Sequence, residues 1–130
     1  MSQRLNISSG APWEAQVGYS RAVRVGNVVE VTGTVAVRNG QVVGPGDAYA
    51  QTVCALEIIA ETLQKAGATL ADVVRTRIYV TDISQWQAYG RAHQEVFGNI
   101  RPCTTMVEVA ALISPEYLVE IEASAVLMDN

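Results

Sequence analysis

The stretch VEIEASA, residues 119–125, decides the fold class because apolar and hydrophilic side chains alternate along it. Successive side chains of a β-strand point to opposite sides of a sheet, so this alternation predicts a strand over Leu118 to Leu127 with two unlike faces. The apolar face carries Val119, Ile121, Ala123 and Ala125, and the hydrophilic face carries Glu120, Glu122 and Ser124.

Two segments upstream of this strand show a similar alternation. Val73 to Thr81 and Cys103 to Ala110 are rich in β-branched residues and are predicted to be strands. A loop through Ser114-Pro115 joins the second of them to the final strand. In the first of them, Arg75, Arg77 and Tyr79 are expected on the hydrophilic face, opposite Val74, Thr76, Ile78 and Val80.

The start of the chain predicts two hairpins. Arg21 to Val25 and Val28 to Val35 flank the turn dipeptide Gly26-Asn27. A second turn at Asn39-Gly40 is a strong hairpin signal, because both residues tolerate positive φ. In the second strand, Glu30, Thr32 and Thr34 are expected on the hydrophilic face, opposite Val29, Val31 and Val35.

Two helices are predicted between these strands. From Asp47 to Gly67 the apolar residues are spaced three or four apart, with Asp47 as the N-cap and Gly67 as the stop. A second helix runs from Ser84 to about Phe97, and Gly98 ends it. Its single expected face carries Trp86, Tyr89, His93, Val96 and Phe97.

The resulting order, β-β-β-α-β-α-β-β, predicts an α+β fold with a mixed sheet and both helices on one face. Because a long helix precedes it, the strand at 73–81 can enter the sheet parallel to an earlier strand. A length of 130 residues suits one domain over residues 1–130. The hydrophilic face of the sheet is either exposed to water or buried between subunits where Arg and Glu pair.

Composition argues against several classes of partner. The 13 acidic and 9 basic residues give a net charge of −4, and no cluster of Lys or Arg predicts a nucleic-acid surface. No apolar run approaches the roughly 20 residues needed to span a membrane. Without a secretion signal, Cys54 and Cys103 are expected to be reduced thiols in the cytoplasm. We expect both to be buried and structural, because no base that would activate Cys103 as a nucleophile is evident.

Standard cofactor and metal motifs are not found in the sequence. His93 is the only histidine and the two cysteines lack zinc spacing, so no metal site is expected. No phosphate-binding glycine loop or nucleophile elbow occurs, and no cofactor is expected. His93 is either a packed, hydrogen-bonded side chain or a catalytic one.

Several motifs, in order and at compatible spacing, resemble the Rid/YjgF family of reactive intermediate deaminases, once named endoribonuclease L-PSP. The similarity covers nearly the whole chain. The motifs are Gly18-Tyr19-Ser20-Arg21-Ala22-Val23, Val31-Thr32-Gly33-Thr34, Ala50-Gln51-Thr52, Ala66-Gly67-Ala68, Asp72-Val73-Val74, Tyr79-Val80-Thr81-Asp82, Arg101-Pro102, Val107-Glu108-Val109-Ala110 and Leu118 to Ala123.

This resemblance implies a chorismate-mutase-like domain that forms a homotrimer, with the three sheets in a central barrel and a ligand cleft between each pair of subunits. It implies hydrolysis of reactive enamines and imines, such as 2-aminoacrylate, to a keto acid and ammonia without a cofactor. The family tyrosine matches Tyr19, the strand glycine matches Gly33, and the glutamate that positions a water matches Glu120. From the residues alone, Tyr19 is equally an interface anchor and Glu120 the partner of an arginine.

The arginine that binds the substrate carboxylate in this family matches Thr104. Losing a hydrogen bond to a charged group costs about 1.5–3 kcal/mol, so 2-aminoacrylate is not the expected substrate. Thr104, Thr105 and Met106 are the expected substrate contacts, with Arg21 or Arg77 as a nearby cation. Pro12-Trp13-Glu14 and Pro102 to Met106 are similar to a branch of the family that lacks the arginine.

Three functions are therefore considered. The first is a hydrolase of imines or enamines that holds its substrate differently. The second is a trimer that binds a small metabolite or a partner protein without turnover. The third, an endoribonuclease, is disfavoured by the acidic composition and the single histidine.

Overall fold

The computed structural model describes residues 3–128, so residues 1–2 and 129–130 of the predicted domain lie outside the described residues. The strands are β1 (Arg4–Ile7), β2 (Ala22–Val25), β3 (Val28–Thr34), β4 (Val37–Arg38), β5 (Gln41–Val42), β6 (Val73–Val80), β7 (Cys103–Glu108) and β8 (Val119–Val126). The helices are α1 (Pro12–Val17), α2 (Ala48–Lys65) and α3 (Trp86–Phe97), with 3₁₀ turns at Leu70–Asp72 and Ile83–Gln85.

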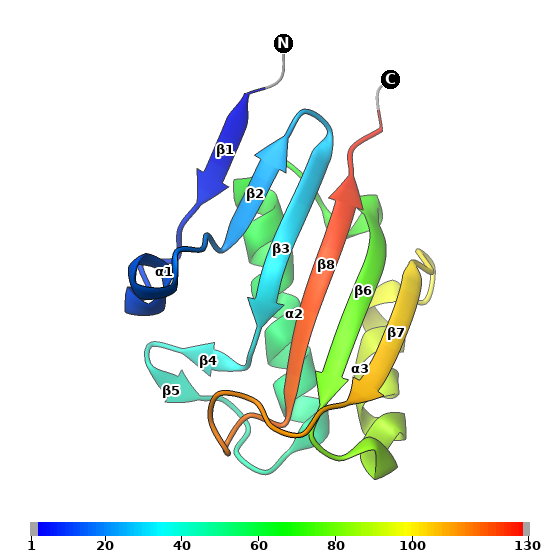
Figure 1. Ribbon diagram of the computed structural model, residues 1–130. Coiled ribbons are helices and arrows are strands. Elements are labelled where there is room, and N and C mark those ends of the chain that lie inside the picture. The colour runs from blue at the N-terminus through cyan, green and yellow to red at the C-terminus, as the bar shows by residue number, and fades with distance from the viewer. Residues whose placement is uncertain (1–2, 129–130) are drawn as a thin grey trace.

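Six strands form one mixed sheet in the order β1-β2-β3-β8-β6-β7 (Figure 1). β8 pairs antiparallel with both β3 and β6, so β6 has the same direction as β3, as predicted, without pairing to it. β7 lies parallel to β6 at the edge. The α+β fold and the mixed sheet predicted from the sequence are confirmed.

The predicted element order is incomplete at the start of the chain. β1 and α1 precede β2, and β4 and β5 form a separate two-stranded hairpin around Asn39-Gly40. Both early elements are short, with four and six residues, and three of the four residues of β1 are exposed. Such short polar segments carry too little periodicity to be predicted.

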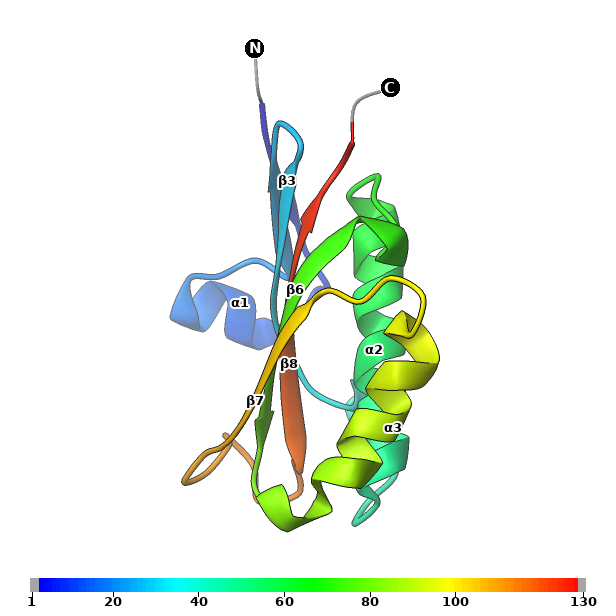
Figure 2. The ribbon, with the colours of Figure 1, turned by 90° about the vertical axis from the view of Figure 1, so that its right-hand side faces the viewer.

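Helices α2 and α3 cover one face of the sheet, and α1 lies on the other side (Figure 2). α2 begins as predicted, because the Asp47 side chain accepts a hydrogen bond from the Ala50 amide at 3.0 Å. The core between these layers is apolar, and the apolar face predicted for β8 is fully buried. Its largest contributors are Leu56, Ile59, Leu63, Ile78, Tyr89, Phe97 and Ile121.

α3 begins two residues later than predicted. Asp82 caps the 3₁₀ turn at Ile83–Gln85, with its carboxylate accepting from the Ser84 amide at 3.0 Å, and α3 follows from Trp86. Tyr89 and Phe97 are buried as expected, but Trp86 is 56% exposed. The prediction for Trp86 is wrong because it stands in the first turn of the helix, beyond the edge of the packed layer.

Because of two β-bulges, some residues of β6 and β3 lie on the opposite face of the sheet from the one predicted. Val74 is an extra residue in β6, so Val73 is buried and Val74 is 47% exposed. In β3, Thr32 and Gly33 together oppose one residue of β8, which turns Thr34 into the core. The faces predicted for Val74 and Thr34 are therefore wrong, because strict alternation does not anticipate an inserted residue.

The two cysteines differ in environment. Cys54 is buried on α2, as expected, but Cys103 is exposed at the start of the edge strand β7. The prediction that both are buried is wrong for Cys103, because an edge strand has no neighbour on one side. Among residues 3–128, no helix is both long enough and apolar enough to cross a bilayer.

Candidate functional site

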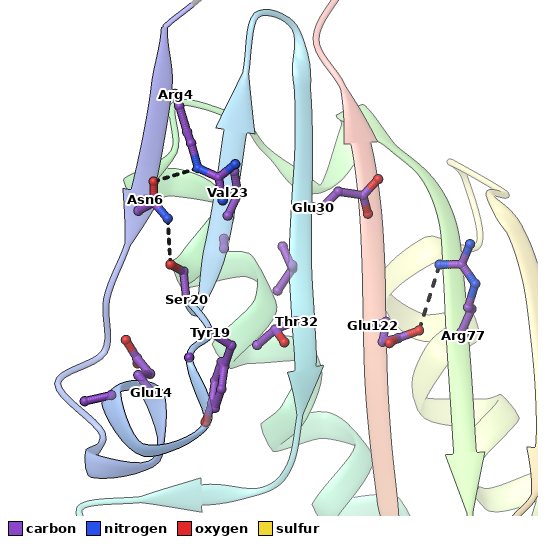
Figure 3. Close-up of a pocket in the computed structure, with 14 residues that line it drawn as sticks. Arg4, Asn6, Glu14, Tyr19, Ser20, Val23, Glu30, Thr32, Arg77 and Glu122 are labelled. Carbon is purple, nitrogen blue, oxygen red and sulfur yellow. Dashed lines mark hydrogen bonds and ion pairs between the residues drawn. The ribbon is translucent and has the colours of Figure 1, made fainter.

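The open face of the sheet bears a cavity with a volume of about 560 Å³. Figure 3 shows Tyr19 and Glu14 on the α1 side, and Glu30, Glu122 and Arg77 on the neighbouring strands. Glu122 accepts a hydrogen bond from the Tyr79 hydroxyl at 2.8 Å and lies 3.9 Å from the Arg77 guanidinium. The side chains expected on the hydrophilic face of β6 and β8 thus interact within a single chain.

Gly33 and Glu120 lie against one another on this face. A Cβ at Gly33 would overlap the Glu120 carboxylate, so any larger residue displaces that side chain. The bulge in β3 opposite Glu122 brings Gly33 to this position. Two of the predicted site residues therefore lie against one another, and a residue larger than glycine at position 33 requires the end of the Glu120 side chain to move.

Arg21 holds the same bulge from the side of β2. One terminal nitrogen of its guanidinium donates to the carbonyls of Thr32, at 3.1 Å, and Gly33, at 2.5 Å. It also lies 3.3 Å from the Thr34 hydroxyl. The Nε of Arg21 is buried with no hydrogen-bond partner among the described residues. Arg21 is a fixed cation beside Gly33.

Opposing influences act on the Glu120 carboxyl. Burial raises the pKa of Glu120 and the neighbouring Glu122 raises it further, whereas the Arg21 guanidinium lowers it. A carboxylate with a raised pKa is suited to accept and return a proton near neutral pH. Glu120 is only half-buried, so water can reach it.

Tyr19 approaches this group from the loop after α1. Its amide donates to the Glu14 carbonyl at 3.0 Å, which fixes the loop to the helix. Its side chain lines the larger cavity. Gly33 and Glu120 thus lie together beside Arg21, whereas Tyr19 lines the larger cavity, whose lining includes neither Gly33 nor Glu120.

A second cavity of about 330 Å³ lies at the far edge of the sheet, between the end of α3 and β7. Gly90 opens one side of it, where no atom lies within 4 Å of an added Cβ. Its other main lining residues are His93, Gln94, Phe97, Arg101, Pro102 and Thr104. The predicted substrate contact Thr104 therefore belongs to a different cavity from Tyr19.

Three side chains form a hydrogen-bonded group at this second cavity. The Thr76 hydroxyl lies 2.8 Å from His93 Nε2 and 2.8 Å from the Thr104 hydroxyl. Thr104 also lies 3.4 Å from His93 Nε2. Burial lowers the pKa of His93, so the ring is neutral at neutral pH. Of the two readings open for His93, the contacts show a hydrogen-bonded side chain that also reaches a cavity.

The three predicted contacts on β7 do not share one face of the sheet, because Thr104 and Met106 face the helices and Thr105 faces the open side. Thr104 pairs in register with buried Thr76 and faces the helices, whereas Thr105 pairs with Arg77 and faces the open side. Met106 packs against the main core. The structure brings Gly33 and Glu120 together, but it does not bring Thr104, Thr105 and Met106 into one group with them.

Sequence reasoning overlooked the positions of Arg101 and Thr76. Arg101 lines the second cavity with a left-handed backbone, and Thr76 links His93 to Thr104. The signal in the sequence was weak: Thr76 is a polar residue on an otherwise apolar strand face. Within residues 3–128, no three His, Cys, Asp or Glu side chains are grouped so as to hold a metal ion.

The sequence is similar to those of known proteins over almost its whole length. The model of the family described as Endoribonuclease L-PSP matches residues 9–127. The 3-aminoacrylate deaminase RutC of Acinetobacter baylyi is 36% identical over 126 residues, which cover 96% of this chain and 98% of that protein. An uncharacterized protein of Streptomyces coelicolor is 38% identical over 119 residues, covering 92% of this chain and 89% of that one.

Solved structures show the same fold. A member of the YjgF/YER057c/UK114 family from Mycobacterium tuberculosis superimposes with a TM-score of 0.88 and 55% identity, covering 96% of this chain and 100% of that chain. A structure described as a putative endoribonuclease from Thermotoga maritima gives a TM-score of 0.82 at 30% identity, covering 95% and 93%.

Proposed function

The chain belongs to the endoribonuclease L-PSP (YjgF) family, and on that premise we propose that it hydrolyses reactive imines or enamines. The observation that carries the proposal is the half-buried Glu120, set against Gly33 beside the fixed cation Arg21. This group combines a carboxylate of raised pKa with a nearby cation. The relationship to a 3-aminoacrylate deaminase supports the same class of reaction.

Hydrolysis of an imine needs one water and two proton transfers. Glu120 takes one proton from water as the oxygen attacks the imine carbon, and it delivers that proton to the nitrogen, which gives a carbinolamine. The hydroxyl group of this intermediate then gives up its proton, which Glu120 transfers to the amino nitrogen as the carbon–nitrogen bond breaks, so a carbonyl compound and ammonia are released. Tyr19 hydrogen-bonds the nitrogen and fixes its direction. These steps need no oxidant or reductant.

The complete cleft forms between copies of the chain. Tyr19 and Glu120 lie on the open face, whereas Thr104 faces the helices at the β7 edge. Two unlike patches that meet across copies form a head-to-tail contact, which closes into a ring. The ring we propose is the homotrimer implied by the family resemblance.

The proposed homotrimer predicts the mass of the protein in solution. Purified protein is expected to sediment with the mass of three chains at micromolar concentration in mild buffer, because the hydrophilic face of the sheet is then covered by its neighbours. Analytical ultracentrifugation measures that mass directly. A protein that stays monomeric under these conditions has no such cleft, and the roles given to Tyr19 and Thr104 would fail together.

The substrate is expected to differ from 2-aminoacrylate, because Thr104 replaces the arginine that the resemblance implies. The decisive assay follows ammonia release from 2-aminoacrylate and from bulkier or uncharged imines, with wild type and Thr104→Arg side by side. Turnover of any imine supports the hydrolase. Absence of ammonia from every imine tested would leave a binding module instead.

Arg21 gives a prediction about pH. Its guanidinium lowers the pKa of Glu120, so Arg21→Gln is expected to raise that pKa. A base works only when ionised, and therefore the acid limb of the kcat/KM profile should move to higher pH in Arg21→Gln. The matched variant Arg77→Gln removes a cation that contacts Glu122 instead, and its profile should stay closer to that of wild type. Equal profiles for wild type and Arg21→Gln would contradict the coupling.

We do not propose ribonuclease activity, although the matching family is described as an endoribonuclease. Glu30, Glu120 and Glu122 lie together on the open face, and their negative charge opposes binding of a phosphate backbone. The cytoplasm, predicted from the sequence, is the compartment in which we propose that the reaction takes place.

A further inference from the structure

Helix α1 presents an exposed apolar face. Trp13 and Val17 stand one turn apart on this six-residue helix, and their exposed fractions are 57% and 72%. The cavity on the open face is lined by Glu14, Ala15 and Gly18 instead, so Trp13 and Val17 lie on the other side of the helix. A tryptophan and a valine exposed together are typical of a contact surface.

α1 is held in place at both ends, although a helix of this length is too short to be stable alone. The Glu14 carboxylate accepts from the Ser9 amide at 2.9 Å, and the Gly18 amide donates to the Glu14 carbonyl at 2.8 Å. In the loop that follows, the Ser20 hydroxyl accepts from the Asn6 amide group of β1 at 2.8 Å. The apolar face is therefore fixed in position before a partner binds, which lowers the entropic cost of binding.

The opposite edge of the sheet offers a surface that fits this face. β7 is the last strand of the described sheet at that edge, whereas α1 lies near the β1 edge (Figure 1). Val107 on β7 pairs in register with Tyr79 and is exposed on the open side, the side on which α1 also lies (Figure 2). The outer strands of a six-stranded sheet lie about 24 Å apart, so a contact between α1 and β7 joins two copies.

We propose that α1 docks on the β7 edge of a second copy, with Trp13 as the anchor, Val17 beside it and Val107 in the receiving surface. The inference rests on the proposed assembly, because it names the helix that joins one copy to the next. Tyr19 follows α1 in the chain and Thr104 lies on β7, so this docking brings the two together from different copies. A single chain therefore holds an incomplete cleft.

Two full-length variants with one tryptophan each locate the contact. Trp86→Phe keeps Trp13, and Trp13→Phe keeps Trp86, which is similarly exposed on α3. Each variant is diluted from micromolar to nanomolar concentration while its sedimentation mass and tryptophan emission are followed. The emission of Trp13 is expected at shorter wavelength in the assembly and should move to longer wavelength as the mass falls. The emission of Trp86 should stay that of an exposed residue throughout.

Substitutions on both sides of the contact test its strength. Trp13→Ser should raise the dissociation constant of the assembly by roughly 30-fold or more, as expected for an anchor residue. Val107→Glu should also raise it, because the charge would lie against Trp13. The matched controls are Trp86→Ser and Leu5→Glu, which change exposed residues on the side of the sheet that carries α2 and α3, and both should assemble like wild type. Circular dichroism checks that each variant is folded.

The possible outcomes separate this docking from the rest of the proposed function. If wild type assembles but Trp13 emits as an exposed residue, or if Trp13→Ser and Val107→Glu assemble as tightly as wild type, the docking is overturned and the homotrimer stands. If the Trp13 emission changes on addition of pyruvate but not with mass, α1 binds a small molecule and the docking is again overturned. A monomeric wild type removes both the docking and the homotrimer. Assembly that depends on Trp13, without release of ammonia from any imine, keeps the docking and loses the hydrolase.

Discussion

Glu120→Gln is expected to lower kcat/KM for imine hydrolysis by roughly 10²–10⁴-fold, the usual contribution of a general acid or base. The amide has nearly the shape of the carboxylate but cannot take a proton from water. Because the side chain already lies against Gly33, the isosteric replacement keeps the packing that Glu120→Ala would lose. Ammonia release under subsaturating substrate measures the effect.

Glu122→Gln is the matched control for this prediction. Glu122 lies on the same face of β8, but it is engaged by the Tyr79 hydroxyl and by Arg77. We expect a change of less than about tenfold, consistent with the loss of one hydrogen bond to a charged group. If both variants lose activity equally, the face as a whole and not Glu120 is responsible. If Glu120→Gln stays fully active, Glu120 is only a structural residue.

Gln51→Leu is expected to cost about 3 kcal/mol or more of the free energy of unfolding. The fully buried Gln51 amide donates to the carbonyls of Glu116, at 3.0 Å, and Gly44, at 3.3 Å, and accepts from the Leu118 amide at 2.9 Å. Leucine fills the space but leaves the Glu116 carbonyl and the Leu118 amide without partners, whereas the Gly44 carbonyl still accepts from the Asp47 amide. Each buried unsatisfied group costs about 1–3 kcal/mol.

Thermal unfolding at a fixed protein concentration measures this loss, which should lower Tm by roughly 10 °C. The same side-chain exchange at Gln64, which is exposed on α2, should change the free energy by no more than about 0.5 kcal/mol. An unchanged Tm in Gln51→Leu would mean that water reaches the freed groups. Because Gln51 fixes the start of β8, its loss should also reduce activity through Glu120.

Elements with a strong local signal were predictable. The cap at Asp47, the turn at Asn39-Gly40 and the buried face of β8 all follow from nearest neighbours in the sequence, and the structure confirms each of them. The bulges at Val74 and Gly33 were not predictable, since they depend on which strand pairs with which. The exposed Trp86 was missed because helical periodicity does not reveal where a packed layer ends.

In the candidate site, too, some residues could be predicted from the sequence and others could not. The resemblance selected Tyr19, Gly33 and Glu120, and their positions on one face are compatible with a shared role. The link from Thr76 through His93 to Thr104 joins residues from β6, α3 and β7, and only the folded chain reveals it. Arg101 belongs to a motif that could be recognised in the sequence, but only the folded chain shows that it lines a cavity.

The central place of β8 has a consequence for synthesis. β8 is the last described strand to be made, yet it joins β3 to β6 in the middle of the sheet. A nascent chain synthesised only as far as β7 therefore holds two partial sheets with open inner edges. These edges are exposed to wrong pairing until β8 is added between them.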